Sequence, residues 1–162
     1  SGDYAYALLD DGTVEITSYG GADTEIVIPD TLDGKPVTAI GERAFYYSLS
    51  LTSVTIPDSV TSIGNSAFSD CSSLATVTLP ASISEISDHL FFACDVLSSV
   101  NIPDSVTRIG ESAFASCDQL HTIDIPSPSS TTALSSFPAS PRSVFPIPSR
   151  PSAMVLSRIA TP

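Results

Sequence analysis

The chain has 162 residues, of which 42% are hydrophobic, and a formal net charge of −12. All 18 acidic residues precede residue 127, where only Lys35, Arg43 and Arg108 oppose them, so nucleic acids and anionic membrane surfaces are excluded as favoured partners. No apolar run approaches the ~18 residues that span a bilayer, and we expect no membrane insertion.

The first 25 residues predict a β-hairpin. Aromatic or apolar residues alternate with others from Tyr4 onwards, Asp11 and Gly12 have the composition of a type I′ turn, and the alternation resumes at Val14. An elongated repeat domain needs an element that covers the apolar end of its first coil. We therefore assign residues 1–25 to an N-terminal β-hairpin cap.

A sequence period of 23 residues follows this segment. One sequence pattern occurs three times, in residues 57–79, 80–102 and 103–125. In each copy, every apolar position lies at the same number of residues from the first proline. The same phase begins at residue 26, with an insertion of five residues after Pro29. One unit cannot bury its apolar residues alone, so the copies must stack, and a period of ~20–29 residues indicates a leucine-rich solenoid. We expect about four coils over residues 26–126.

Each coil contains a short strand in which a buried residue is flanked by two outward residues. Stacking these strands gives a parallel sheet with one polar face. Gly41, Gly64 and Gly110 indicate a bend with positive φ, and Ser87 is the exception in that slot. The phenylalanines recur at one phase and predict an aromatic spine in the core. The expected outward residues of the sheet are Ser53, Thr55, Thr76, Thr78, Ser99, Asn101, Thr122 and Asp124.

The three cysteines, Cys71, Cys94 and Cys117, recur once per coil. Their spacing is a by-product of the period, and we expect a ladder of buried thiols, with a bridge between neighbouring sulfurs as the alternative.

We find no constellation typical of catalysis or metal binding, and we expect neither an enzyme nor a cofactor. His89 and His121 occupy different phases of the repeat, and no nucleophile elbow or zinc-ligand spacing is present. Asp58 and Asp104 follow strand prolines two coils apart, too far for one Ca²⁺ to bridge, which favours turn capping.

The repeat pattern ends at residue 127, and residues 127–162 contain ten Ser and seven Pro. This composition predicts an extended or disordered tail of the stalk type. Two alternatives remain open: the tail covers the last coil with its apolar residues, or a frame change in the encoding DNA replaced further repeats.

The phrase from Ile56 to Leu74 resembles the BspA-like leucine-rich repeats of bacterial surface proteins, and the resemblance covers roughly residues 26–126. It implies a right-handed β/α superhelix of mainly short parallel β-strands with short helical turns. It also implies a secreted or cell-surface module that binds extracellular proteins or glycans of a host or neighbouring cell, with adhesion as a common role, through the sheet face. The alternative is a structural spacer or fragment of a longer repeat protein with no ligand of its own. A homodimer through the C-terminal end of the solenoid is a further expectation.

Overall fold

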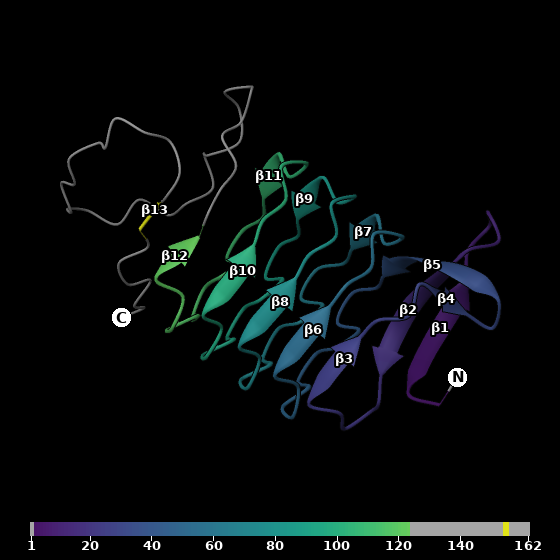
Figure 1. Ribbon diagram of the computed structural model, residues 1–162, viewed down its shortest axis with the longest axis horizontal. Helices are drawn as coiled ribbons and strands as arrows, with labels where there is room; N and C mark the ends of the chain where they lie inside the picture. The colour runs from purple at the N-terminus through teal and green to yellow at the C-terminus, as the bar shows by residue number, and fades with distance from the viewer. Residues whose placement is uncertain (1, 124–153, 156–162) are drawn as a thin grey trace.

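The computed structural model describes residues 2–123 and 154–155, and every regular element in them is a β-strand. The strands follow one another along an elongated coil that starts at the N-terminal cap (Figure 1). Their bounds are β1 Tyr4–Leu8, β2 Val14–Tyr19, β3 Glu25–Val27, β4 Thr31–Leu32, β5 Lys35–Ile40, β6 Ser53–Thr55, β7 Ser62–Ile63, β8 Thr76–Thr78, β9 Glu85–Ile86, β10 Ser99–Asn101, β11 Arg108–Ile109, β12 Thr122–Ile123 and β13 Met154–Val155.

Strands β1 and β2 form the antiparallel pair expected in the N-terminal segment. The type I′ turn is wrong, because only Gly12 has a positive φ (84°) and Asp11 does not. The Asp11 carboxylate accepts hydrogen bonds from the backbone N–H and the hydroxyl of Thr13, at 2.9 and 2.6 Å, and this local capping favours a longer loop. The second strand of the pair also bonds in parallel to β5, so β2 already follows the path of the coils.

Two sides of the coil are parallel ladders. The polar sheet has the order β10-β8-β6-β3, and its register pairs Ser53 with Thr76 and Thr76 with Ser99, one period apart. The second sheet runs from β2 through β5 to β7, and β9 pairs with β11 in the same direction. Strand β4 forms an antiparallel pair with β5 inside the predicted insertion, and β12 pairs antiparallel with β13. The strands form the predicted solenoid of about four coils, but not the β/α superhelix implied by the resemblance, because the described residues contain no helix.

The third side of each coil is a run of tight turns, so the short helical turns implied by the resemblance are wrong for the described residues. Left-handed residues recur four positions apart in each run, for example Ser66 (φ 55°) and Asp70 (φ 59°), and they interrupt any helical path. Every second backbone N–H on this side donates instead to a carbonyl of the next coil. For example, the N–H of Phe45 donates to the carbonyl of Ala67 at 2.8 Å, and the N–H of Phe68 donates to the carbonyl of Leu90 at 3.1 Å. This third ladder ties each coil to its successor.

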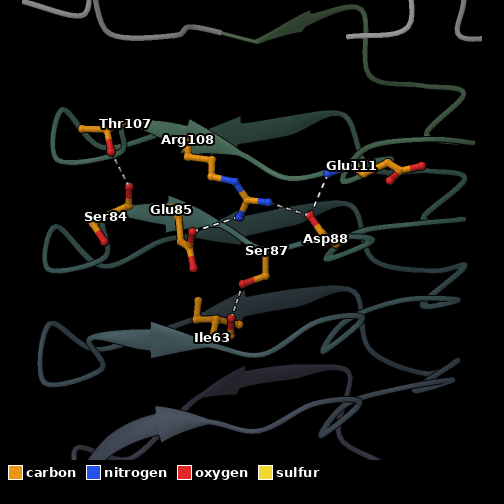
Figure 2. A network of polar contacts seen from close by, with 8 residues as sticks. All are labelled: Ile63, Ser84, Glu85, Ser87, Asp88, Thr107, Arg108 and Glu111. Carbon is orange, nitrogen blue, oxygen red and sulfur yellow. Dashed lines mark hydrogen bonds and ion pairs between the residues drawn. The ribbon is translucent and has the colours of Figure 1, made fainter. Parts of the chain in front are cut away.

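The glycine slot is explained by contact between coils, because Gly41, Gly64 and Gly110 do not have positive φ. A Cβ on Gly64 would lie 2.5 Å from the backbone nitrogen of Glu42 in the preceding coil. The expectation of a positive-φ bend is therefore wrong. Gly64 and Gly110 are required because the backbone of the preceding coil leaves no space for a Cβ at these two positions. Ser87 fits the same slot while buried, and its hydroxyl donates a hydrogen bond to the carbonyl of Ile63 (Figure 2).

The core contains the predicted aromatic spine, extended by two tyrosines of the cap. Phe45, Phe68, Phe91 and Phe114 stack with ring centroids 4.8, 5.8 and 5.6 Å apart. Tyr19 stacks on Phe45 at 5.2 Å, and Tyr4 lies 5.2 Å from Tyr19. The cap thus covers the first coil with the same kind of side chain that fills the coils.

The cysteines are free and buried, as predicted, and each thiol bonds to the neighbouring coil. Their Sγ atoms donate to the carbonyls of Phe45, Phe68 and Phe91, at 3.1, 3.2 and 3.1 Å. Burial raises the pKa of Cys71 to about 11 and that of Cys117 to about 12, and it also raises the pKa of Cys94. The slot therefore holds a small donor that remains protonated.

These thiols should not react with a soluble disulfide reagent such as Ellman's reagent near pH 8 while the chain is folded. Reaction requires the thiolate and access, and burial removes both. Absorbance should report three reactive thiols only after unfolding in urea. Rapid reaction of even one thiol in the folded chain would contradict the buried ladder.

Candidate functional site

The polar sheet presents two rows of outward side chains. In each of its strands the middle residue is buried (Val54, Val77 and Val100 in β6, β8 and β10), and the two flanking residues point out. Ser53 and Thr55 are half-buried, while Thr76, Thr78, Ser99 and Asn101 are exposed. These six predicted site residues therefore lie on one face. Thr122 falls in β12, of which only the backbone is described, and Asp124 lies outside the described residues.

The strand register places equivalent residues side by side. One row consists of Glu25, Ser53, Thr76 and Ser99, and the other of Val27, Thr55, Thr78 and Asn101. Neighbours in a row are separated by the ~4.7–4.9 Å spacing of paired strands. The hydroxyl of Thr76 donates to that of Ser53 at 3.2 Å, so the first row is partly connected by hydrogen bonds. From β6 to β10 the face offers hydroxyl and amide groups at a regular repeat along the solenoid axis, and β3 adds the carboxylate of Glu25 and the apolar side chain of Val27.

Glu25 and Val27 belong to these rows, although the sequence prediction did not include them. They flank buried Ile26 in β3, and Val27 is 72% exposed. The signal was present, because Ile26 begins the repeat phase. The insertion after Pro29 separates β3 from β6 by 28 residues instead of 23, which hides the equivalence from a search at the main period.

The polar sheet has almost no charged residues. Glu25 is the one charged residue in strands β3, β6, β8 and β10. The bases of the described body lie elsewhere, and Arg108 of β11 forms ion pairs with Glu85 at 3.0 Å and with Asp88 at 3.2 Å. The rows therefore suit a partner that is recognised by hydrogen bonds more than by charge.

The β9–β11 pair and the residues beside it carry a polar network that holds two coils together (Figure 2). Besides the ion pairs of Arg108, the carboxylate of Asp88 accepts from the backbone N–H of Glu111 at 2.8 Å, and Thr107 donates to the carbonyl of Ser84 at 3.2 Å. Asp58 makes the same kind of contact in another pair of coils: its carboxylate accepts a hydrogen bond from the backbone N–H of Ala81 at 2.9 Å. These carboxylates cap amides of the following coil, which gives them a structural role.

The described residues do not assemble a reactive cluster. The imidazole of His89 lies 5.8 Å from the ring of Phe92, and His121 is exposed after Leu120. Within residues 2–123 and 154–155, no three His, Cys, Asp or Glu side chains are grouped as ligands for one metal ion. A hollow of about 370 Å³ lies between the start of β1 and the β4 segment, and it is open to solvent. In the same part of the chain, no helix is long and apolar enough to cross a membrane.

Comparisons with known proteins agree with this architecture. A profile described as the BspA type leucine-rich repeat region matches residues 38–153 in six copies. Among solved structures, a leucine-rich repeat protein of T. pallidum is 38% identical with a TM-score of 0.70, and one from Bacteroides capillosus is 37% identical with a TM-score of 0.69. A leucine-rich repeat protein from Bacteroides ovatus is 26% identical with a TM-score of 0.68.

The extent of these matches differs between the neighbours. The aligned part covers 73% of this chain and 56% of the T. pallidum protein, 76% and 94% for the B. capillosus protein, and 78% and 40% for the B. ovatus protein. The chain therefore spans about half the length of the T. pallidum protein. None of the curated proteins compared with the chain is similar to it.

Proposed function

The chain belongs to the BspA-type leucine-rich repeat family, and from this premise we propose that it is a non-catalytic binding module that recognises an extracellular protein or glycan through the polar sheet. We assign the module to the cell surface or the extracellular space, because the BspA-like repeats that it resembles are common in bacterial surface proteins. Adhesion is the role that this location favours.

One observation carries the proposal, namely the two rows of outward polar side chains held in register by parallel strands. Every strand of the polar sheet buries its middle residue, so its backbone and its side-chain directions are fixed. A site on rigid strands loses little conformational entropy when a partner binds. Hydroxyl and amide groups can donate or accept hydrogen bonds, and solenoids provide extended surfaces for such contacts.

A second candidate function is that of a structural spacer without a ligand of its own. Two longer neighbours motivate it, since the aligned part covers 40% of the B. ovatus protein and 56% of the T. pallidum protein, whereas it covers 94% of the B. capillosus protein. A module of a longer array needs only to continue the stack. Pairing of two copies through the C-terminal end of the solenoid belongs to this candidate, and light scattering on the full chain would detect it as a doubled mass.

The variant Thr78→Arg with Asn101→Glu tests the polar sheet. These residues are exposed register partners, so the two new side chains can pair with each other while they obstruct the rows. We expect capture from a panel of extracellular-matrix proteins and glycans to weaken at least tenfold, with an unchanged circular dichroism spectrum.

The matched control is Ser62→Arg with Gln119→Glu, which adds the same charges at exposed positions off the polar sheet. It should capture the partner as the unmodified chain does. If both variants bind equally well, the polar sheet is not the binding surface. If the unmodified chain captures nothing from the panel, the spacer function replaces the proposed one.

A further inference from the structure

One turn of the first coil exposes an unusual amount of aromatic surface. Tyr46 is 50% exposed, Tyr47 61% and Leu49 43%, and these three make up half of the large apolar side chains that are exposed in the described residues. They lie on the turn side of the coil, away from the polar sheet. We call Arg43, Tyr46 and Tyr47 the aromatic turn.

The fold does not require these side chains. The later coils have Ser69, Phe92 and Ala115 at the position of Tyr46, and Asp70, Ala93 and Ser116 at the position of Tyr47. The backbone is nevertheless the same, because Tyr47 has φ 61° and its equivalents have φ 59°, 54° and 59°. A bulky residue is uncommon in the left-handed region, where Asp is better tolerated. The choice of tyrosine at position 47 therefore points to a role other than stability.

The aromatic turn combines flat apolar surfaces with hydrogen-bonding groups. The rings of Tyr46 and Tyr47 have centroids 6.1 Å apart and planes inclined by 33°. The guanidinium carbon of Arg43 lies 5.9 Å from the centroid of the Tyr46 ring, and its Nε lies 3.9 Å from a carboxylate oxygen of Glu42. Both of these charged side chains are about two-thirds exposed. Two rings, two phenolic hydroxyls and a guanidinium thus face solvent together.

We propose that the aromatic turn is a second binding site, distinct from the polar sheet, and that its ligand is an uncharged saccharide. The apolar face of a hexose ring stacks on a tyrosine ring, and its hydroxyls bond to the guanidinium, the carboxylate and the phenols. Tyrosine provides such contacts at a low cost in conformational entropy. The separation of the two rings suits adjacent sugar units of one oligosaccharide.

Size and charge select this ligand over other occupants of an aromatic surface. Two rings and one leucine are much less than the ~800 Å² that each partner buries in a stable protein interface. Nucleic-acid bases also stack on exposed aromatic rings, but the acidic body of this chain repels their phosphates. A neutral sugar chain satisfies both constraints.

The test is calorimetry of the full chain with cellohexaose, xylohexaose, mannohexaose and chitohexaose. The variant Tyr46→Ser with Tyr47→Asp gives the first coil the residues that the second coil has at Ser69 and Asp70, so the fold accommodates them. We expect at least one hexasaccharide to bind the unmodified chain, and at least tenfold weaker binding to this variant. The chain has no Trp, so tyrosine emission should change on binding, and that change should disappear in the variant.

The control is the polar-sheet variant Thr78→Arg with Asn101→Glu, which should bind the hexasaccharide like the unmodified chain. This control separates the two sites, because a failure of the polar-sheet function leaves the saccharide result intact. Absence of binding to all four hexasaccharides, or equal binding by the aromatic-turn variant, overturns the proposal. So does a result in which the aromatic-turn variant loses capture of a matrix protein while it retains the saccharide.

Discussion

Replacing Phe68 with alanine is expected to lower the free energy of unfolding by about 3–5 kcal/mol. The ring is fully buried and stacks between Phe45 at 4.8 Å and Phe91 at 5.8 Å, so its removal leaves a cavity bordered by two coils. Neighbouring coils cannot collapse into this space without breaking the backbone ladder on the turn side. Urea denaturation followed by circular dichroism measures the loss.

The control for this prediction is Tyr46→Ala, which removes an aromatic ring from the same side of the solenoid. Tyr46 is 50% exposed and stands outside the spine, so we expect a change of less than about 1 kcal/mol. The stability of a solenoid depends on the interfaces between neighbouring coils. Because Phe68 packs against both neighbouring coils, we expect its loss to destabilise the whole described body and not only one coil. Similar effects for the two variants would show that the phenylalanine spine does not hold the coils together.

Replacing Gly64 with alanine is expected to destabilise the chain by about 3 kcal/mol, the second large effect. The added Cβ would lie 2.5 Å from the backbone nitrogen of Glu42 and 2.7 Å from the carbonyl carbon of Gly41. Both atoms are backbone, so no flexible side chain can move aside and the two coils must separate. The unfolding midpoint in urea reports the change.

Gly20→Ala is the matched control, because a Cβ at Gly20 meets only the carbonyl oxygen of Asp3, at 4.0 Å, and the residue does not have a positive φ. We expect it to be neutral or slightly stabilising, since alanine restricts the unfolded chain. Equal stability of the Gly64→Ala and Gly20→Ala chains would contradict the close approach of the coils at Gly64.

The period of the sequence predicted most of the buried residues of the coils, although Val106 and Ile109, at two core positions of the last copy, are only partly buried. Phe68 and Val77 recur at constant phase, and a constant phase means a constant environment in a stack. Alternation around Val77 then placed Thr76 and Thr78 outward, where the structure has them. The polar rows therefore follow from two periods, 23 for the coil and two for the strand.

The parts that were not predicted depend on backbone geometry and on close contacts that residue types do not reveal. The reason for Gly64 is the backbone of Glu42 in the preceding coil, and a glycine in a sequence does not show whether φ or space requires it. The left-handed residues Asp70 and Ala93 are not glycine, so the turns on that side looked compatible with a helix. Tyr19 joins the aromatic spine across the irregular first coil, which the repeat spacing does not reach.

The most direct test of the stacked coils is a nuclear Overhauser experiment on aromatic protons with selectively labelled phenylalanine. Stacking at 4.8, 5.8 and 5.6 Å predicts contacts between Phe45 and Phe68, between Phe68 and Phe91, and between Phe91 and Phe114. Contacts between rings two coils apart should be absent. If the rings of adjacent coils showed no mutual contact, or if Phe45 contacted Phe91 directly, the coils would not be stacked in register, and the polar rows that depend on that register would not exist.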